Sequence, residues 1–146
     1  MGGLTVPSEG RIRIDGETDD LRQSIGYAAL DLALYPDLSA LEHLTLATQL
    51  RGGTSDAASL LEKVNLRKDQ PTREFSSGMR ARLRLALAIQ HAPLVLLLDE
   101  PSASLDQEGR ELVQQIIQEQ TWRGVVILAT NDPQEKEWTH HAITLG

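Results

Sequence analysis

Two continuous apolar runs constrain the fold more than any other feature of the sequence. Residues 94–98 read LVLLL and residues 125–129 read VVILA, without one polar side chain in either run. Short uninterrupted apolar runs are typical of strands in parallel sheets, because helices cover both faces of such sheets. Between the runs, apolar residues from Leu112 to Ile117 repeat at helical spacing. Strand, helix and strand in this order predict an α/β sandwich with two fully buried strands.

The remaining elements are expected on both sides of a helical region. Ser39 and Glu42 have the spacing of a capping box and open the first of three helices between residues 39 and 92. Further strands are expected at residues 11–15, 24–28 and 142–145. The predicted organisation is a single domain over residues 1–146, in which a helical subdomain (39–92) is inserted into an α/β core (1–38 and 93–146).

Composition indicates which partners and which cellular compartment to expect for this chain. The formal net charge of −7 argues against nucleic acid as the main partner, because phosphate contacts need clustered Lys and Arg. The chain has no cysteine, which excludes disulfides and thiolate metal sites. No apolar run approaches the roughly 18 residues that cross a bilayer, and no signal leader is recognisable. We therefore expect a cytoplasmic protein that reaches a membrane by docking to a separate protein.

Two acidic residues, Asp99 and Glu100, directly follow the first apolar run. Ligand sites of α/β proteins open at the carboxyl ends of strands, which is where this pair is expected to lie. Asp99 suits a Mg²⁺ ion, and Glu100 suits the orientation or deprotonation of an attacking water. The alternative is an acidic pair that merely ends a strand and begins a loop, and the pair by itself leaves both interpretations open.

A Ser-Ser-Gly turn stands at the predicted start of the third helix. The hydroxyls of Ser76 and Ser77, the backbone N–H groups around Gly78 and Met79, and the positive end of the helix dipole together suit a phosphate. The alternative is an ordinary serine N-cap followed by glycine, and this alternative is favoured when the motif is taken alone.

Taken together, these motifs resemble a known family. The stretch from Phe75 to Asp106 resembles the signature helix, Walker B strand and D-loop of ABC (ATP-binding cassette) transporter ATPases, in order and spacing. Residues 3–10 resemble the turn after the first helix of that family, and residues 126–133 resemble the strand and switch that carry the H-loop. The resemblance implies a partial P-loop NTPase sandwich, with a mostly parallel sheet and an inserted ABC-type helical subdomain. The signature and switch sequences look most like the haem-exporter (cytochrome c biogenesis) branch.

The resemblance also implies a function and partners. An ATP-binding subunit of this family binds ATP and Mg²⁺ and couples ATP hydrolysis to membrane transport. It pairs head to tail with a second ATPase subunit and docks on a transmembrane permease at the inner face of the cell membrane.

Residue roles follow from the same resemblance. Ser76, Ser77 and Gly78, with Met79 in the same motif, would contact nucleotide held by the opposite subunit, and Asp106 would lie at the interface. On nucleotide held by its own subunit, Asp99 would bind Mg²⁺ and Glu100 would activate water. Asn131 occupies the place of the switch histidine, from which its amide would hydrogen-bond the γ-phosphate. The alternative for Asn131 is a turn residue without a catalytic role.

The sequence departs from the family pattern in the phosphate loop and the Q-loop. No G-x-x-x-x-G-K-[S/T] motif and no Gly-Lys pair occur among the 146 residues, and Leu30 stands near the expected Q-loop glutamine. We therefore expect the chain by itself not to hydrolyse ATP. One hypothesis is an ABC ATPase whose phosphate loop lies upstream of Met1, in sequence lost by truncation. The other is a natural pseudo-ATPase that supplies Ser76–Gly78 in trans to an intact partner. The first is favoured, because Met1-Gly2-Gly3 begins within a motif.

Two expectations concern surfaces. By resemblance, the strand that precedes the phosphate loop lies between residues 125–129 and the last strand, so a chain without it should have a gap or an exposed apolar edge. We expect one of three compensations: the last strand moves inward, another chain pairs with the edge, or the fold is only marginally stable. The arginines of the third helix, Arg80, Arg82 and Arg84, are expected on a solvated or interface face.

Overall fold

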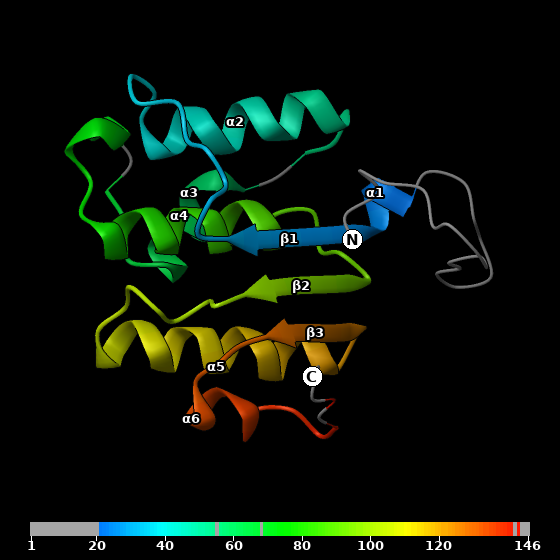
Figure 1. Cartoon of the computed structure of the whole chain (residues 1–146). Helices are drawn as coiled ribbons and strands as arrows, with labels where there is room; N and C mark the ends of the chain where they lie inside the picture. The colour runs from blue at the N-terminus through cyan, green and yellow to red at the C-terminus, as the bar shows by residue number, and fades with distance from the viewer. Residues whose placement is uncertain (1–20, 55, 68, 142, 144–146) are drawn as a thin grey trace.

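Three parallel strands form the centre of the described structure. The computed structural model describes residues 21–54, 56–67, 69–141 and 143. Its sheet has the order β1-β2-β3, with β1 at Ile25–Ala29, β2 at Val95–Asp99 and β3 at Val125–Ala129. Ala29, Asp99 and Ala129 are aligned in register, so the three carboxyl ends meet at one edge, where the arrowheads of Figure 1 point.

The strands agree closely with the sequence-based expectations. The strands predicted at residues 24–28 and 94–98 each begin one residue later, and the strand predicted at 125–129 has the expected bounds. The parallel sheet with its flanking helices confirms the predicted α/β class. The strands predicted at 11–15 and 142–145 lie outside the described residues, Ile143 excepted. The division into a helical subdomain and a core stays a prediction.

Helices surround the sheet and begin at recognisable caps. Their bounds are α1 (Leu21–Ser24), α2 (Ala40–Arg51), α3 (Ala57–Lys63), α4 (Ser77–Ile89), α5 (Gln107–Thr121) and α6 (Pro133–Lys136), with a 3-10 turn at Thr72–Glu74. The predicted capping box is confirmed: the Ser39 hydroxyl accepts from the Glu42 N–H, and the Glu42 carboxylate accepts from the Ser39 N–H at 2.7 Å. In Figure 1, α2, α3 and α4 lie on the β1 side of the sheet, and α6 lies beyond β3.

The core joins the sheet to α4 and α5. Leu96 and Leu98 of β2 are buried together with Leu83 of α4 and Val113 of α5. The predicted apolar stripe of α5 is confirmed, since its four members are all buried: Leu112, Val113, Ile116 and Ile117. Burial of these side chains anchors β2, and with it the acidic pair at its end, to a rigid framework.

The prediction that β3 is fully buried is wrong. Val125 is 55% exposed and Ile127 is 56% exposed, whereas Val126 and Leu128 pack against the core. Alternate side chains of a strand point to opposite faces, and α5 covers the face of β3 to which Val126 and Leu128 belong. Within the described residues, β3 is the last strand of the sheet. The exposed apolar edge expected from the resemblance stays a prediction, because the exposed side chains of Val125 and Ile127 lie on a face of the sheet.

A further expectation about exposure is wrong. Arg82 is only 8% exposed, because its guanidinium lies 3.2 Å from the Asp106 carboxylate and donates to the Val64 carbonyl at 3.3 Å. On α2, the apolar side chain of Leu50 is 79% exposed. The buried residues of α2 end at Leu44, in the first half of the helix, so its last turn lies outside the packed region.

Candidate active site

The residues predicted to act on nucleotide held by their own subunit lie at one edge of the sheet, at the carboxyl ends of the strands. Asp99 is the last residue of β2, Glu100 follows it, and Asn131 lies two residues after β3. The Asp99 side chain is exposed. Burial, followed by the negative charges of Asp31 and Asp99, raises the pKa of Tyr27 on β1. Asp99 lies there beside Glu100 and the Arg84 guanidinium, so carboxylates and a cation share these strand ends.

Glu100 and Asn131 are in direct contact. The Asn131 backbone N–H donates to Glu100 Oε1 at 2.9 Å, and the Asn131 side-chain Nδ2 donates to the same oxygen at 3.1 Å. Glu100 Oε2 is left for other contacts. The backbone of Glu100 has a φ of 48°, an uncommon value for a residue with a side chain, and its N–H donates to the Ala129 carbonyl at 2.9 Å. Strained backbone of this kind concentrates at functional sites.

The residues predicted to contact nucleotide held by the opposite subunit form a second group at the start of α4. Ser76 is the N-cap of α4, and its hydroxyl oxygen accepts from the Met79 N–H at 3.2 Å. Ser76 and Ser77 are exposed. A Cβ added to Gly78 would lie 3.1 Å from the Ser104 carbonyl oxygen, so the helix start approaches the loop after β2 closely. The glycine permits this approach.

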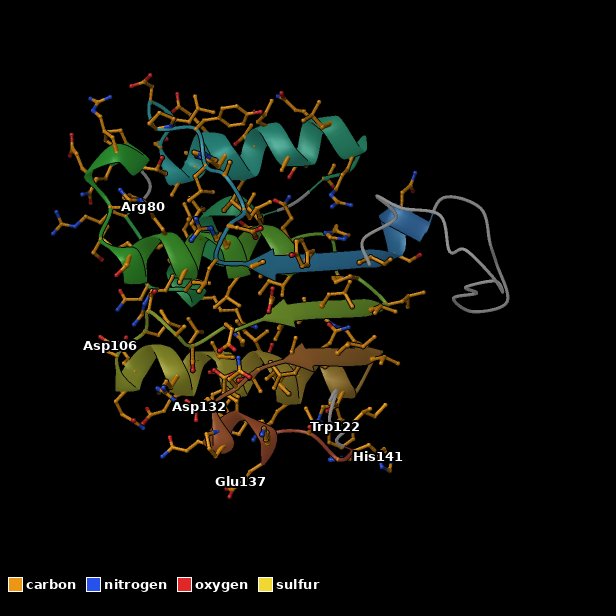
Figure 2. The ribbon with its side chains drawn as sticks, in the orientation of Figure 1. Arg80, Asp106, Trp122, Asp132, Glu137 and His141 are labelled. Atoms are coloured by element: carbon orange, nitrogen blue, oxygen red, sulfur yellow. The ribbon has the colours of Figure 1, made fainter. Side chains whose placement is uncertain are left out.

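Asp106 belongs to the same side of the molecule. Its carboxylate caps α5 by accepting from the Gly109 N–H at 2.9 Å, and it pairs with Arg82 of α4 at 3.2 Å. The hydrogen bond from Gly109 lowers the pKa of Asp106 most, and Arg82 lowers it further. In Figure 2, Asp106 and Arg80 lie at the end of the molecule toward which the strands point, whereas Trp122 and His141 lie at the other end.

Residues to which the sequence analysis assigned no role in the site hold the segment after β3 in place. The Asp132 carboxylate caps α6 by accepting from the Gln134 N–H at 2.9 Å, and it pairs with Arg110 of α5, also at 2.9 Å. The hydrogen bond from Gln134 lowers the pKa of Asp132, and Arg110 adds to this effect. Glu135 is buried against Ser102. The one available signal was Asp132-Pro133, a cap followed by a helix-starting proline.

A small recess opens between the ends of β1 and β2 and helix α4. It is lined by Ala28, Ala29, Leu30, Ala81, Arg84, Leu85, Asp99, Glu100 and Pro101. The Arg84 Nε donates to the Leu32 carbonyl at 2.8 Å, which fixes the loop after β1 against α4. Leu30 contributes an apolar side chain to this recess.

The carboxylates of the recess suit a metal ion whose remaining ligands are supplied by water and by a bound phosphate. The described residues contain no group of three or more His, Cys, Asp or Glu side chains that could hold a metal by themselves. Mg²⁺ is commonly bound by one or two carboxylates together with water and substrate phosphates. Asp99 and the free oxygen of Glu100 fit that arrangement. Among the helices of the described part, none has the length and apolarity needed to cross a membrane.

Comparison with known proteins gives a consistent result. The family model described as "ABC transporter" matches residues 1–103. The chain is 34% identical to the ergothioneine transport ATP-binding protein EgtV of Helicobacter pylori, covering 92% of this chain and 70% of that protein. It is 32% identical to the cytochrome c biogenesis ATP-binding export protein CcmA of Haemophilus influenzae, covering 90% and 66%. It is 30% identical to the linearmycin resistance ATP-binding protein LnrL of Bacillus subtilis, covering 93% and 48%. The chain thus spans about half to two-thirds of the length of these relatives.

Solved structures extend the likeness to three dimensions. A dimeric post-hydrolysis state of an ATP-binding cassette bound to ADP and Pi superposes with a TM-score of 0.81 at 25% identity, over 94% of this chain and 69% of that one. An ATP-binding subunit of an ABC transporter superposes with a TM-score of 0.80 at 25% identity, over 93% of this chain and 62% of that one.

Proposed function

This chain belongs to the ABC transporter family, and from that premise we propose that it serves as an ATP-binding subunit that couples ATP hydrolysis to membrane transport. The observation that carries the proposal is the contact between Glu100 and Asn131 at the carboxyl ends of β2 and β3. Two segments 31 residues apart meet there beside Asp99, where a nucleotide phosphate and its metal ion can be held.

The strand-end residues have distinct roles in this proposal. Asp99 would hold Mg²⁺ together with phosphate oxygens and water, and the ion would neutralise charge on the phosphates. Because Asn131 holds Oε1 of Glu100, Oε2 is directed to the attacking water as hydrogen-bond acceptor. The Asn131 amide keeps one N–H for the γ-phosphate, since its other N–H is donated to Glu100.

The start of α4 would act on nucleotide held by a second subunit. The first N–H groups of α4 and the positive end of its dipole would favour an anion there, to which the exposed Ser77 hydroxyl could also donate. The Ser76 oxygen already caps the helix, so Ser76 offers its hydroxyl hydrogen rather than an acceptor. The dimeric neighbour bound to ADP and Pi supports a two-subunit arrangement of this kind. Asp106 lies beside the α4 start and would face the subunit interface.

A transmembrane permease is the proposed partner, with the subunit at the inner face of the cell membrane. The names of the relatives indicate different processes, from ergothioneine transport to cytochrome c biogenesis, at 34% and 32% identity. Because these two identities are nearly equal, they do not indicate which substrate this chain helps to transport. Haem export, indicated by the signature and switch sequences, stays a prediction.

The proposal can be tested by tagging the protein in the cells that make it. We expect it to co-purify with an integral membrane protein and with ATPase activity. In that complex, where the phosphate loop would come from outside these 146 residues, Glu100→Gln should lower kcat by about 10²-fold or more, the usual loss when a general base is removed, and should leave the complex intact. Trp122→Ala is the control, because Trp122 is 90% exposed and lies at the far end of the molecule (Figure 2). Recovery without a membrane component, or unchanged kcat in Glu100→Gln, would contradict the proposal.

The 146 residues by themselves should neither bind Mg-ATP tightly nor hydrolyse it. No lysine-bearing glycine loop is present among them to cradle the β- and γ-phosphates. Calorimetric titration of Mg-ATP into the folded chain should show no binding in the micromolar range. Micromolar affinity would mean that other residues cradle the phosphates.

A further inference from the structure

A buried carboxylate on α6 has no part in the proposed chemistry. Glu135 is only 1% exposed, and its Oε1 accepts hydrogen bonds from both the backbone N–H and the hydroxyl of Ser102. Its Oε2 is also buried and receives no hydrogen bond from the described residues. Burying a carboxylate is costly unless specific partners compensate, and an apolar side chain would fill the same space at less cost. The hydrogen bonds to Ser102 therefore distinguish Glu135 from a residue that only fills space.

The Glu135–Ser102 contact joins the same two segments as the Glu100–Asn131 contact. Ser102, itself 1% exposed, lies two residues after Glu100 in the loop that leads to Asp106. Glu135 lies four residues after Asn131 on the short helix that follows β3. The two pairs thus form successive links between the loop after β2 and the segment after β3.

The link to Ser102 is better shielded from water than the other link of this segment. The Arg110–Asp132 pair joins the same segment to α5, but its side chains are 28% and 24% exposed. A partly exposed ion pair is weakened by solvent and salt, whereas a buried hydrogen-bonded pair is not screened in this way. Glu135 thus supplies a buried link between α6 and the loop after β2, in addition to the more exposed contact of Glu100 with Asn131.

We propose that Glu135 is a positioning residue, which holds the loop after β2 against the segment after β3 so that Asn131 keeps its two hydrogen bonds to Glu100. The role of Glu135 in catalysis rests on the proposed function, because the orientation of Glu100 matters only if Glu100 activates a water. The structural link itself is a property of this chain. It joins the loop that bears Glu100 and Asp106 to the segment that bears Asn131, and so makes them move together.

The proposal distinguishes between two replacements of Glu135. Glu135→Gln keeps a carbonyl oxygen that can accept from both donors of Ser102. Glu135→Leu fills nearly the same volume but leaves the buried N–H of Ser102 without an acceptor. Arg110→Gln is the matched control, because it breaks the other link of the same segment and leaves Ser102 and Glu135 in contact.

The test is amide hydrogen exchange and NMR on the whole chain without nucleotide. In Glu135→Leu, we expect exchange at the Ser102 and Asn131 amides to rise about tenfold or more, since a buried donor loses its acceptor, while Val113 in the core is unchanged. The Asn131 side-chain amide signals should shift in the same variant. Glu135→Gln should keep the exchange rates and the Asn131 signals of the unaltered chain. Arg110→Gln should leave the exchange rate of the Ser102 amide unchanged.

Unchanged exchange and unchanged signals at Asn131 in Glu135→Leu would overturn the proposal. If Glu135→Leu unfolds, Ser102→Ala provides the same test, because it removes only the hydroxyl donor. The Asn131 side-chain amide signals must then shift, and unchanged signals would overturn the proposal. These readouts need no ATP, so a failure of the link is distinct from a failure of the ATPase assignment, which the tagged complex tests.

Discussion

At the residue scale, His91 couples the stability of the fold to pH. Its Nε2 lies 3.1 Å from the Ile25 carbonyl oxygen, so this nitrogen carries the proton and donates it. Its Nδ1 is buried and has no hydrogen-bond partner among the described residues. Burial lowers the pKa of His91, Arg51 lowers it further, and the hydrogen bond to Ile25 raises it in part. The folded chain therefore disfavours the charged imidazolium.

We predict that the free energy of unfolding falls as the pH drops below about 6.5, the ordinary histidine pKa. Because the folded pKa is depressed, the unfolded chain binds more protons in this range, and stability rises with pH there. Urea denaturation between pH 8 and pH 5.5 measures the effect. His91→Gln, which keeps an N–H for the Ile25 carbonyl, should lose less stability over the same range. The same pH dependence in both proteins would assign the effect to another group.

At the element scale, β1 and α4 approach so closely that a glycine is required. A Cβ added to Gly26 would lie 2.1 Å from the Ala88 carbonyl oxygen of α4 and 2.8 Å from the Pro93 ring. No rotation of a side chain can relieve a clash with backbone atoms. The strand or the helix would have to move, and the ends that carry Leu30 and Asp99 would move with them.

We therefore predict that Gly26→Ala lowers the free energy of unfolding by about 3 kcal/mol or more, the upper range for overpacking a core. Gly53→Ala is the matched control, because a Cβ there would meet no atom within 4 Å. The control should change stability by less than about 1 kcal/mol. Chemical denaturation of the two variants measures both values, and equal losses would contradict the close approach.

Local interactions account for the elements that could be predicted from the sequence. The capping box of α2 joins residues three apart, and the α5 stripe is a pattern within one helix. Such features need no knowledge of the rest of the fold. The acidic pair could be placed at a strand end for the same reason.

Contacts between distant segments could not be predicted in this way. Arg82 is buried because Asp106, 24 residues away, is folded against it, and Glu135 meets Ser102 across 33 residues. The contact between Glu100 and Asn131 depends on the register that aligns Asp99 with Ala129. Helical or strand periodicity indicates which side chains are apolar, but not which neighbours cover them, and the exposure of Val125 shows this limit.

At the scale of the whole molecule, the side of β3 away from β2 has no partner strand among the described residues. The Val125 N–H donates to the Leu94 carbonyl and the Ala129 carbonyl accepts from the Glu100 N–H, so both residues bond toward β2. In a parallel ladder the alternate residues, Val126 and Leu128, then direct their N–H and C=O groups outward. No described strand pairs with β3 on that side. An uncharged strand with free backbone groups is a template for pairing with another chain.

We predict that the isolated 146-residue chain self-associates through β3 and that a charge on this strand prevents it. Ile127 is 56% exposed, so Ile127→Lys should shift the chain to monomer in sedimentation velocity with little change in its urea midpoint. Leu128→Lys is the matched control, because Leu128 is on the same strand but packs against the core. That variant should lower the urea midpoint, since an unpaired charge would be buried. If the unaltered chain is monomeric at every concentration and Ile127→Lys changes neither property, β3 is not an open edge of the folded protein.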